Sequence, residues 1–198
     1  MISIIDYGAG NLKSVKNALD YLGADSVITG DANMILAADK VILPGVGAFG
    51  AAMDALRSSG LDRVIRETAD SGKPLLGICL GLQLMFEESE ESPGAEGLGI
   101  FKGKIVKIPD TGLKIPHIGW NSITLKKESK ILKKENAFVY FVHSYYLKTD
   151  DTDIVSASTE YGAELDIAVE RGNIFATQFH PEKSGGAGIQ ILKNFTEL

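Results

Sequence analysis

The sequence predicts an α/β fold: a doubly wound, mostly parallel sheet with helices on both faces, followed by an antiparallel, strand-rich second half. Three observations lead to this prediction. Short, nearly continuous apolar runs in the first half are typical of strands that are buried on both faces. Helical patterns separate these runs, and such alternation indicates a parallel sheet. Over residues 100–180 the apolar runs alternate with polar residues, as antiparallel strands do.

Four apolar runs are the expected strands of the parallel part: residues 2–6, 25–29, 40–43 and 74–79. Helices are expected to connect them. The first begins after Asn11 as N-cap and ends before Gly23, because apolar residues recur at helical spacing between the two.

Three more helical patterns follow in the first half. They cover residues 49–56, residues 61–72, and a stretch that starts at Cys79 or Leu80. We expect the acidic run 87–91 to end this last helix at the surface. Acids at a helix C-terminus oppose the helix dipole, which leaves a local functional role open.

The second half predicts short strands and a closing helix. The strand candidates are residues 103–109, 121–127, 137–143, 153–158, 166–170 and 173–179. Arg171-Gly172 separates the last two as a hairpin turn, and Ile191, Leu192 and Phe195 indicate a C-terminal helix. The charged stretch 126–135 is expected to be a solvated turn. Without a repeat or linker, residues 1–198 are expected to form one domain.

Composition excludes several classes of function. The formal net charge is -6 and the pI about 5.1, whereas a nucleic-acid binder needs a basic face. A single cysteine excludes an internal disulfide and fits a reducing cytoplasm. The N-terminal stretch lacks the pattern of a signal peptide, and no apolar run is long enough to span a membrane. We therefore expect a cytoplasmic protein without nucleic-acid or membrane partners.

Cys79 is the only cysteine, and it stands between a strand run and a helical pattern. Gly77 and Gly81 flank it in the G-x-nucleophile-x-G form of a sharp strand-to-helix turn. On such a turn the backbone passes too close to tolerate a Cβ. The following helix N-terminus favours a thiolate, and the N–H of Leu80 would face an oxyanion. These residues alone leave two interpretations open, a buried structural thiol and a nucleophile.

His180 and Glu182 form a second candidate element in FHPEKS, residues 179–184. In an extended segment, residues i and i+2 point to the same face, so the carboxylate can orient the imidazole. A thiol, a histidine and an orienting acid are the parts of a catalytic triad. Taken alone, the pair also fits a surface histidine beside a turn proline.

The glycine-rich loop PGVGAFG, residues 44–50, follows a predicted parallel strand. Backbone amides can meet a ligand at the carboxyl end of such a strand, although a tight turn also explains the glycines. The segment DYGAGNLKS lacks the third glycine of a dinucleotide site. The three histidines, His117, His143 and His180, share no metal-ligand spacing, so no metal site is expected.

Together, GICLGLQLMFE around Cys79, FHPEKS around His180 and PGVGAFG resemble the class I, triad-type glutamine amidotransferases. Three further motifs narrow the resemblance to the glutaminase subunits of imidazole glycerol phosphate synthase. They are DYGAGNLKSV at the N-terminus, IPHIGWN at 115–121 and YFVHSYY at 140–146. The resemblance covers essentially the whole chain.

The resemblance implies a role for each matching residue. Cys79 attacks the side-chain amide of glutamine, His180 transfers protons, and Glu182 orients His180. The oxyanion hole consists of the amide of Leu80 and one from the glycine loop: Gly45, Val46 and Gly47. Four further residues are implied to hold glutamine: Gln83, His143, Ser144 and Tyr145. No cofactor is implied.

The resemblance also implies a partner. Ammonia released to water becomes ammonium, which is not a nucleophile, so the family docks the glutaminase onto a cyclase subunit. That subunit is a separate (β/α)8 barrel, which forms a heterodimer with the glutaminase. It uses the ammonia to convert N′-phosphoribulosylformimino-AICAR to imidazole glycerol phosphate and AICAR in histidine biosynthesis. Four residues lie in motifs near the docking face: Asn11, Trp120, Asn121 and Lys183.

Three other functions fit these motifs less well. A glutaminase that serves another acceptor, such as chorismate or a pyridoxal phosphate synthase, is disfavoured by IPHIGWN and DYGAGN. A cysteine peptidase or hydrolase of similar fold is disfavoured by the His-Pro-Glu ending. A non-catalytic binding module is disfavoured because Cys79, His180 and Glu182 are all present.

Overall fold

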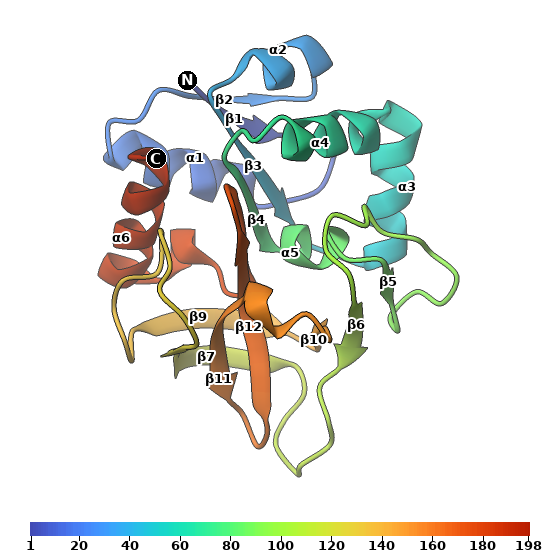
Figure 1. Ribbon diagram of the computed structural model, residues 1–198, viewed down its shortest axis with the longest axis vertical. Helices are drawn as coiled ribbons and strands as arrows, with labels where there is room; N and C mark the ends of the chain where they lie inside the picture. The colour runs from blue at the N-terminus through green and yellow to red at the C-terminus, as the bar shows by residue number, and fades with distance from the viewer.

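The computed structural model describes all 198 residues, and a parallel sheet forms its centre (Figure 1). Five strands lie side by side in the order β2-β1-β3-β4-β13, each parallel to its neighbours. They are β1 (Ile2–Ile5), β2 (Ser26–Thr29), β3 (Lys40–Gly45), β4 (Leu75–Cys79) and β13 (Ile174–Thr177). Four of them are almost entirely buried, as their continuous apolar sequences predict.

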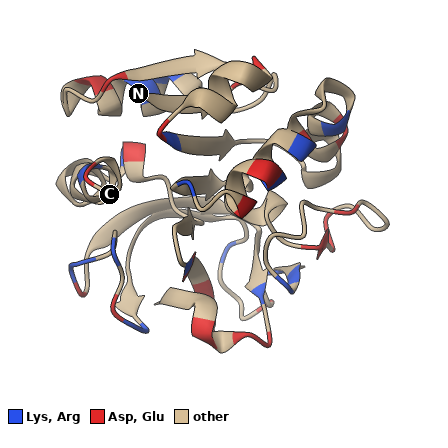
Figure 2. Ribbon diagram, turned by 45° about the horizontal axis from the view of Figure 1, so that its top comes forward, with Lys and Arg blue, Asp and Glu red and all other residues tan.

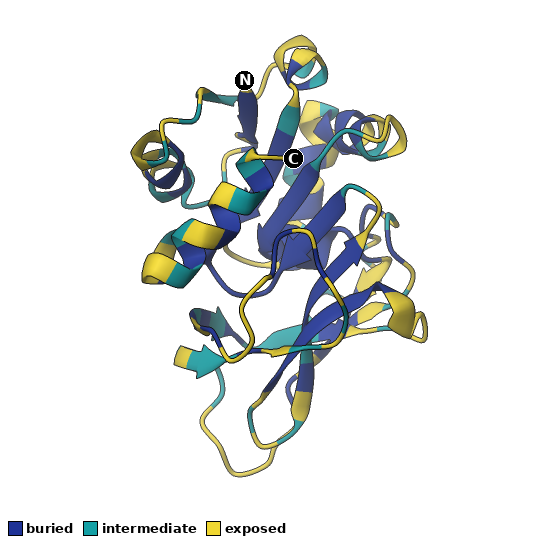
Figure 3. Ribbon diagram, turned by 60° about the vertical axis from the view of Figure 1, so that its left-hand side comes forward, coloured by how far each residue is buried: buried dark blue, intermediate teal, exposed yellow.

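Helices cover both faces of this sheet. Alternate strand residues serve the two faces: Ile5 packs with α2, α3 and α4, whereas Ile4 packs with α1 and α6. Figure 3 shows the buried strands between helices whose outer faces are exposed. The predicted doubly wound class is therefore confirmed. The helices are α1 (Leu12–Tyr21), α2 (Ala32–Ala37), α3 (Phe49–Ser59), α4 (Leu61–Asp70), α5 (Leu80–Leu84) and α6 (Gly185–Thr196).

The second half extends the sheet with mostly antiparallel strands. β12 (Glu164–Arg171) pairs with β13 through the predicted hairpin, and Gly172 in its turn has φ +62°. Beyond β12 lie β5 (Glu88–Ser89), β6 (Lys104–Lys107), β8 (Thr124–Leu125), β10 (Tyr145–Lys148) and β11 (Val155–Glu160).

A separate two-stranded antiparallel sheet lies beside this half and contributes to the site described below. It consists of β7 (His117–Ser122) and β9 (Phe138–His143). Two short 3-10 turns complete the chain, η1 (Thr152–Ile154) and η2 (Pro181–Lys183).

The structure corrects three local predictions. The helix after Cys79 ends at Leu84, and the acidic run 87–91 enters strand β5 instead of ending a helix. Helix α2 was not predicted, since it spans only six residues and relies on Asp31, whose side chain accepts from the N–H of Met34 at 2.9 Å.

The third correction concerns the charged stretch 126–135, which is only partly solvated. Its residues Ser129, Ile131 and Leu132 are buried. The carboxylate of Glu170 accepts from the Ser129 hydroxyl and from the Lys130 amide, at 2.5 and 3.1 Å. This long-range anchor is not visible in local charge patterning.

Figure 2 shows acidic and basic residues interspersed over the helices and loops. None of the helices is long and apolar enough to cross a membrane.

Candidate active site

Cys79 occupies a sharp turn between β4 and α5 at the carboxyl edge of the parallel sheet. Its φ of 56° and ψ of −109° are unusual for a residue with a side chain. A Cβ on Gly77 would lie 2.9 Å from the backbone of Gly81, and one on Gly81 would lie 1.9 Å from the carbonyl oxygen of Leu43. Both glycines of the motif are therefore required by close backbone approach, as the sequence predicted.

His180 and Glu182 follow the end of β13, the strand that pairs with β4. They therefore lie at the same edge of the sheet as Cys79. His180 Nδ1 is 2.8 Å from Glu182 Oε1, and both side chains are almost fully buried. The predicted pairing is therefore present, although Glu182 lies in the 3-10 turn η2 and not in extended chain. The backbone is anchored to β9, since the N–H of His180 donates to the carbonyl of Tyr140 at 3.0 Å.

The electrostatics of the site favour a protonated His180. Burial alone lowers the pKa of His180, but Cys79 and Glu182 outweigh burial and raise this pKa to about 9. Glu182 occupies Nδ1, whereas Nε2 is buried without a hydrogen-bond partner. Burial and the nearby Cys79 also raise the pKa of the Tyr7 hydroxyl, so Tyr7 stays neutral beside the thiol.

A cavity of about 300 Å³ opens above Cys79. Nine residues from the sequence analysis line it: Val46, Gly47, Cys79, Leu80, Gln83, His143, Ser144, Tyr145 and His180. The cavity has room for a small polar substrate. Glu182 lies outside this lining, on the far side of the imidazole.

The glycine loop approaches the nucleophile through strand pairing. Gly45 at the end of β3 lies opposite Cys79 on β4. A Cβ on Gly45 would lie 2.6 Å from the Tyr7 hydroxyl and 2.9 Å from Leu80 Cβ, so only glycine fits there. Val46 and Gly47 come next and are exposed. Leu80 is the first residue of α5, where the backbone N–H has no partner within the helix.

Residues 143–145, at the junction of β9 and β10, line another part of the cavity. His143 Nδ1 lies 2.8 Å from the carbonyl oxygen of Tyr145, and its Nε2 lies 3.1 Å from His117 Nδ1. Burial lowers the pKa of both histidines to about 4. Both are therefore neutral at pH 7, and His143 donates from Nδ1 while it accepts at Nε2.

The four predicted interface residues lie outside the cavity. Trp120 on β7 is 55% exposed, and Lys183 in η2 is also exposed. Asn121 donates to the carbonyl of Glu160 at 2.8 Å, on the face of β7 opposite to Trp120. Asn11 precedes α1 as predicted, but its side chain makes no cap bond and instead accepts from the Ser14 hydroxyl at 2.9 Å.

Four further residues at the site were not predicted from the sequence. Glu91, Pro116 and Val142 line the cavity, and the Gln178 amide nitrogen lies 3.7 Å from Cys79 Sγ. Glu91 comes from the acidic run 87–91, and its Oε2 accepts from the N–H of Phe49 at 2.8 Å. That unusual run of acids was the one local signal that could have indicated it.

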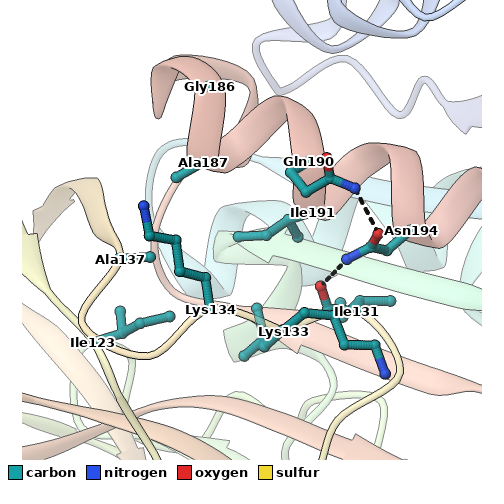
Figure 4. Close-up of a pocket in the computed structure, with 11 residues that line it drawn as sticks. Ile123, Ile131, Lys133, Lys134, Ala137, Gly186, Ala187, Gln190, Ile191 and Asn194 are labelled. Carbon is teal, nitrogen blue, oxygen red and sulfur yellow. Dashed lines mark hydrogen bonds between the residues drawn. The ribbon is translucent and has the colours of Figure 1, made fainter.

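A second cavity, of about 150 Å³, lies between α6 and the loop before β9 (Figure 4). It is lined mainly by apolar side chains such as Ile131 and Ile191. Its amides are already paired, since Asn194 donates to the carbonyl of Ile131 and accepts from Gln190. It contains no cysteine, histidine or carboxylate, so it holds none of the groups that the candidate triad chemistry needs.

The family model "Glutamine amidotransferase class-I" matches residues 3–198. The fold agrees with solved structures of low sequence identity. PurLQS from Thermotoga maritima superposes with a TM-score of 0.79 at 20% identity, covering 99% of this chain and 97% of that one. A crystal structure of a glutamine amidotransferase gives a TM-score of 0.78 at 18% identity, with 99% and 97% coverage. The chain therefore belongs to the class I glutamine amidotransferases.

Curated relatives with about 50% sequence identity place the chain more narrowly within this class. Imidazole glycerol phosphate synthase subunit HisH of Methanothermobacter thermautotrophicus is 50% identical, over 100% of this chain and 98% of the relative. The subunit of the same name from Caldanaerobacter subterraneus subsp. tengcongensis is 52% identical, with the same coverage. Within the class, this chain belongs to the family of these HisH subunits.

Proposed function

We propose that this chain is the glutaminase subunit of an imidazole glycerol phosphate synthase. It hydrolyses glutamine to glutamate and ammonia and supplies the ammonia to a separate cyclase subunit. The observation that carries the proposal is the cavity in which Cys79 and His180 meet, with Glu182 held 2.8 Å behind His180. Family membership supports the same reaction, because the relatives with about 50% identity share its name.

The reaction follows from the charges of the triad. At pH 7, His180 is imidazolium because its pKa is about 9, and the sulfur of the neighbouring Cys79 attacks the amide carbon of glutamine as a thiolate. A C–S bond forms and the carbonyl electrons move to oxygen. When the C–N bond breaks, the proton on His180 Nε2 goes to the leaving nitrogen, which departs as ammonia. Neutral His180 then takes a proton from water, whose oxygen displaces the sulfur and releases glutamate.

Two backbone N–H groups stabilise the developing oxyanion in this scheme. One is that of Leu80, and the other belongs to the segment after Gly45, at Val46 or Gly47. The pairing of Gly45 with Cys79 supports this role because it brings the loop next to the sulfur. Loss of one such donor costs roughly 10²–10³ in rate in comparable enzymes.

The remaining lining residues fit the polar ends of glutamine. In this proposal Gln83 contacts the substrate from α5, and His143, Ser144 and Tyr145 contact it from the junction of β9 and β10. We add Glu91 to this set. One of its carboxylate oxygens is held by the N–H of Phe49, which leaves the other to bind the α-ammonium group of the substrate.

The partner in this proposal is a cyclase with a (β/α)8 barrel, and the two form a heterodimer. An exposed apolar patch supports a docking surface on the β7–β9 sheet: Ile118, Trp120 and Phe138 are all more than half exposed. Ile118 lies opposite Val142, which lines the cavity, so the patch continues to the cavity mouth. We place the complex in the cytoplasm, where a single cysteine stays reduced.

Substitution of the nucleophile tests the proposal. In a complex with the cyclase, Cys79→Ala should lower glutamine-dependent turnover by at least roughly 10³-fold, because no thiol remains to form the acyl intermediate. Turnover of the same complex with added ammonium salts should stay at the wild-type value, which serves as the internal control. Normal use of glutamine by the variant would refute the role of Cys79, and the absence of any complex would refute the partner.

A further inference from the structure

Gln178 is a buried amide that the mechanism above does not use. It follows β13, two residues before His180, and its side chain is fully buried. Its backbone N–H donates to the carbonyl of Ile167 at 2.8 Å, which fixes the main chain. Its amide nitrogen lies 3.7 Å from Cys79 Sγ, within reach of an N–H···S hydrogen bond. It does not line the substrate cavity.

The orientation of this amide follows from its partners. The Gln83 side chain lies 3.3 Å from the carbonyl oxygen of Tyr145. A carbonyl only accepts, so the atom of Gln83 at that place is its NH₂ group. The same NH₂ lies 3.1 Å from the Gln178 amide, which must therefore present its oxygen to Gln83. The NH₂ group of Gln178 is then the end that faces Cys79.

A donor in this place has a defined electrostatic effect. A thiolate accepts hydrogen bonds, whereas a thiol is only a weak acceptor, so a fixed N–H favours the charged form of the sulfur. The amide keeps its donor at every pH, unlike His180. Because Gln178 is buried and held on its other side, it requires no reorganisation when the charge forms.

We propose that Gln178 is a positioning residue that holds the thiolate of Cys79 by an N–H···S hydrogen bond, with its amide oriented by Gln83. This inference rests on the proposed role of Cys79 as nucleophile. Gln83 then has a second role besides contacting the substrate, because it orients the Gln178 amide that donates to the sulfur. The chain of bonds runs from the Tyr145 carbonyl through Gln83 and Gln178 to Cys79.

Several titratable groups surround the Cys79 sulfur, and their charges also affect its protonation. His180 faces it from beyond β13, with Glu182 behind. Tyr7 faces it from the end of β1 and stays neutral. Glu91 and neutral His143 line the cavity on the other side. A change at Gln178 to another neutral side chain adds no charge and removes none of these groups.

The test uses the pH profile of alkylation of the whole chain by iodoacetamide. Cys79 is the only cysteine, so the reaction reports on this sulfur alone. Gln178→Met keeps the length of the side chain but has no N–H donor. Gln178→Asn keeps the amide on a side chain that is one methylene group shorter, which moves the donor away from the sulfur. For both variants, we expect the midpoint of the alkylation profile to move up by about one pH unit. We also expect kcat for glutamine to fall, with a smaller change in KM.

Thr177→Val is the matched control, because Thr177 is the buried neighbour in β13 and its hydroxyl donates to the carbonyl of Phe179, away from Cys79. Its alkylation profile should coincide with that of the wild type. Circular dichroism identifies variants that do not fold, and Gln178→Asn carries the test if Gln178→Met fails.

An unchanged midpoint in the folded Gln178 variants would overturn the inference, even if KM rises, because Gln178 would then only support Gln83. Its failure is distinct from failure of the proposed function. If Cys79→Ala loses glutamine turnover while the Gln178 variants keep the wild-type profile, only this inference is wrong. If Cys79→Ala keeps glutamine turnover, the function proposed above is wrong as well.

Discussion

At the scale of single residues, the candidate nucleophile depends on a strained backbone. Cys79 has a positive φ, a conformation that costs of order 1–3 kcal/mol for a residue with a side chain. The surrounding packing supplies that energy, since β3, β4 and α5 lie so close that Gly77 and Gly81 admit no Cβ. The strain turns the sulfur toward the cavity and away from the sheet.

The pairing of His180 with Glu182 predicts a pH dependence of stability. Because the folded pKa of His180, about 9, lies above its unfolded value near 6.5, the stabilisation is complete below pH 6.5 and is lost as the pH rises to 9. Glu182→Gln removes one cause of the raised pKa. We expect the difference in free energy of unfolding between wild type and variant to be largest at pH 6 and to shrink toward pH 9.

Urea denaturation at pH 6, 7.5 and 9 measures that difference. The difference cancels the pH effects of all other groups that the two proteins share. A difference that stays constant over this range would contradict the raised pKa of His180.

At the scale of secondary structure elements, the β7–β9 sheet has two unlike faces. On one face, His117 stacks between Phe141 and Tyr161, and buried His143 lies against Phe141. The other face exposes Ile118, Trp120 and Phe138. An apolar patch of this kind, continuous with the candidate active site, is typical of a surface that a partner covers.

Trp120 tests that surface. Trp120→Ala should weaken binding of the cyclase at least roughly tenfold, as is typical of a buried aromatic anchor in an interface. Tyr21→Ala is the matched control, because Tyr21 is a 79% exposed aromatic residue at the far end of α1. Titration calorimetry gives both dissociation constants. Equal affinities for the two variants would exclude the β7–β9 sheet as the docking face.

At the scale of the whole molecule, the site forms where parallel strands end together. β1 leads to Tyr7, β3 to Gly45, β4 to Cys79 and β13 toward His180, all at one edge of the sheet. The carboxyl edge of such sheets is the usual place for ligands. The Val46–Gly47 segment of this site has few packing contacts. Val46 is 43% exposed, and the space beside Gly47, at φ +104°, is open.

This unsupported loop predicts that glutaminase activity depends on the partner. The isolated chain should hydrolyse glutamine slowly, and the complex with the cyclase and its nucleotide ligand should be at least roughly tenfold faster. Binding would hold the Val46–Gly47 segment with an N–H toward the oxyanion. Single-turnover assays of the chain alone, with the cyclase, and with cyclase plus ligand separate the two contributions. Equal rates in all three would contradict this coupling.

Much of the fold was predictable because its signals are local. Continuous apolar runs marked the buried strands, and the two glycines around Cys79 marked the elbow through steric limits that hold in any fold. The pairing of His180 and Glu182 was also predictable, since the residues are two positions apart. Family motifs identified further candidate residues that local physics left ambiguous, such as His143 and Tyr145.

The sequence by itself thus determined the fold class and the short-range parts of the candidate site. Only the tertiary structure decided which distant side chains meet. The bonds of Gln178 to Gln83 and Cys79, of Glu91 to Phe49, and of His117 to His143 join segments far apart in the chain. No local pattern specifies such contacts, because they depend on strand order and on the register of packed elements.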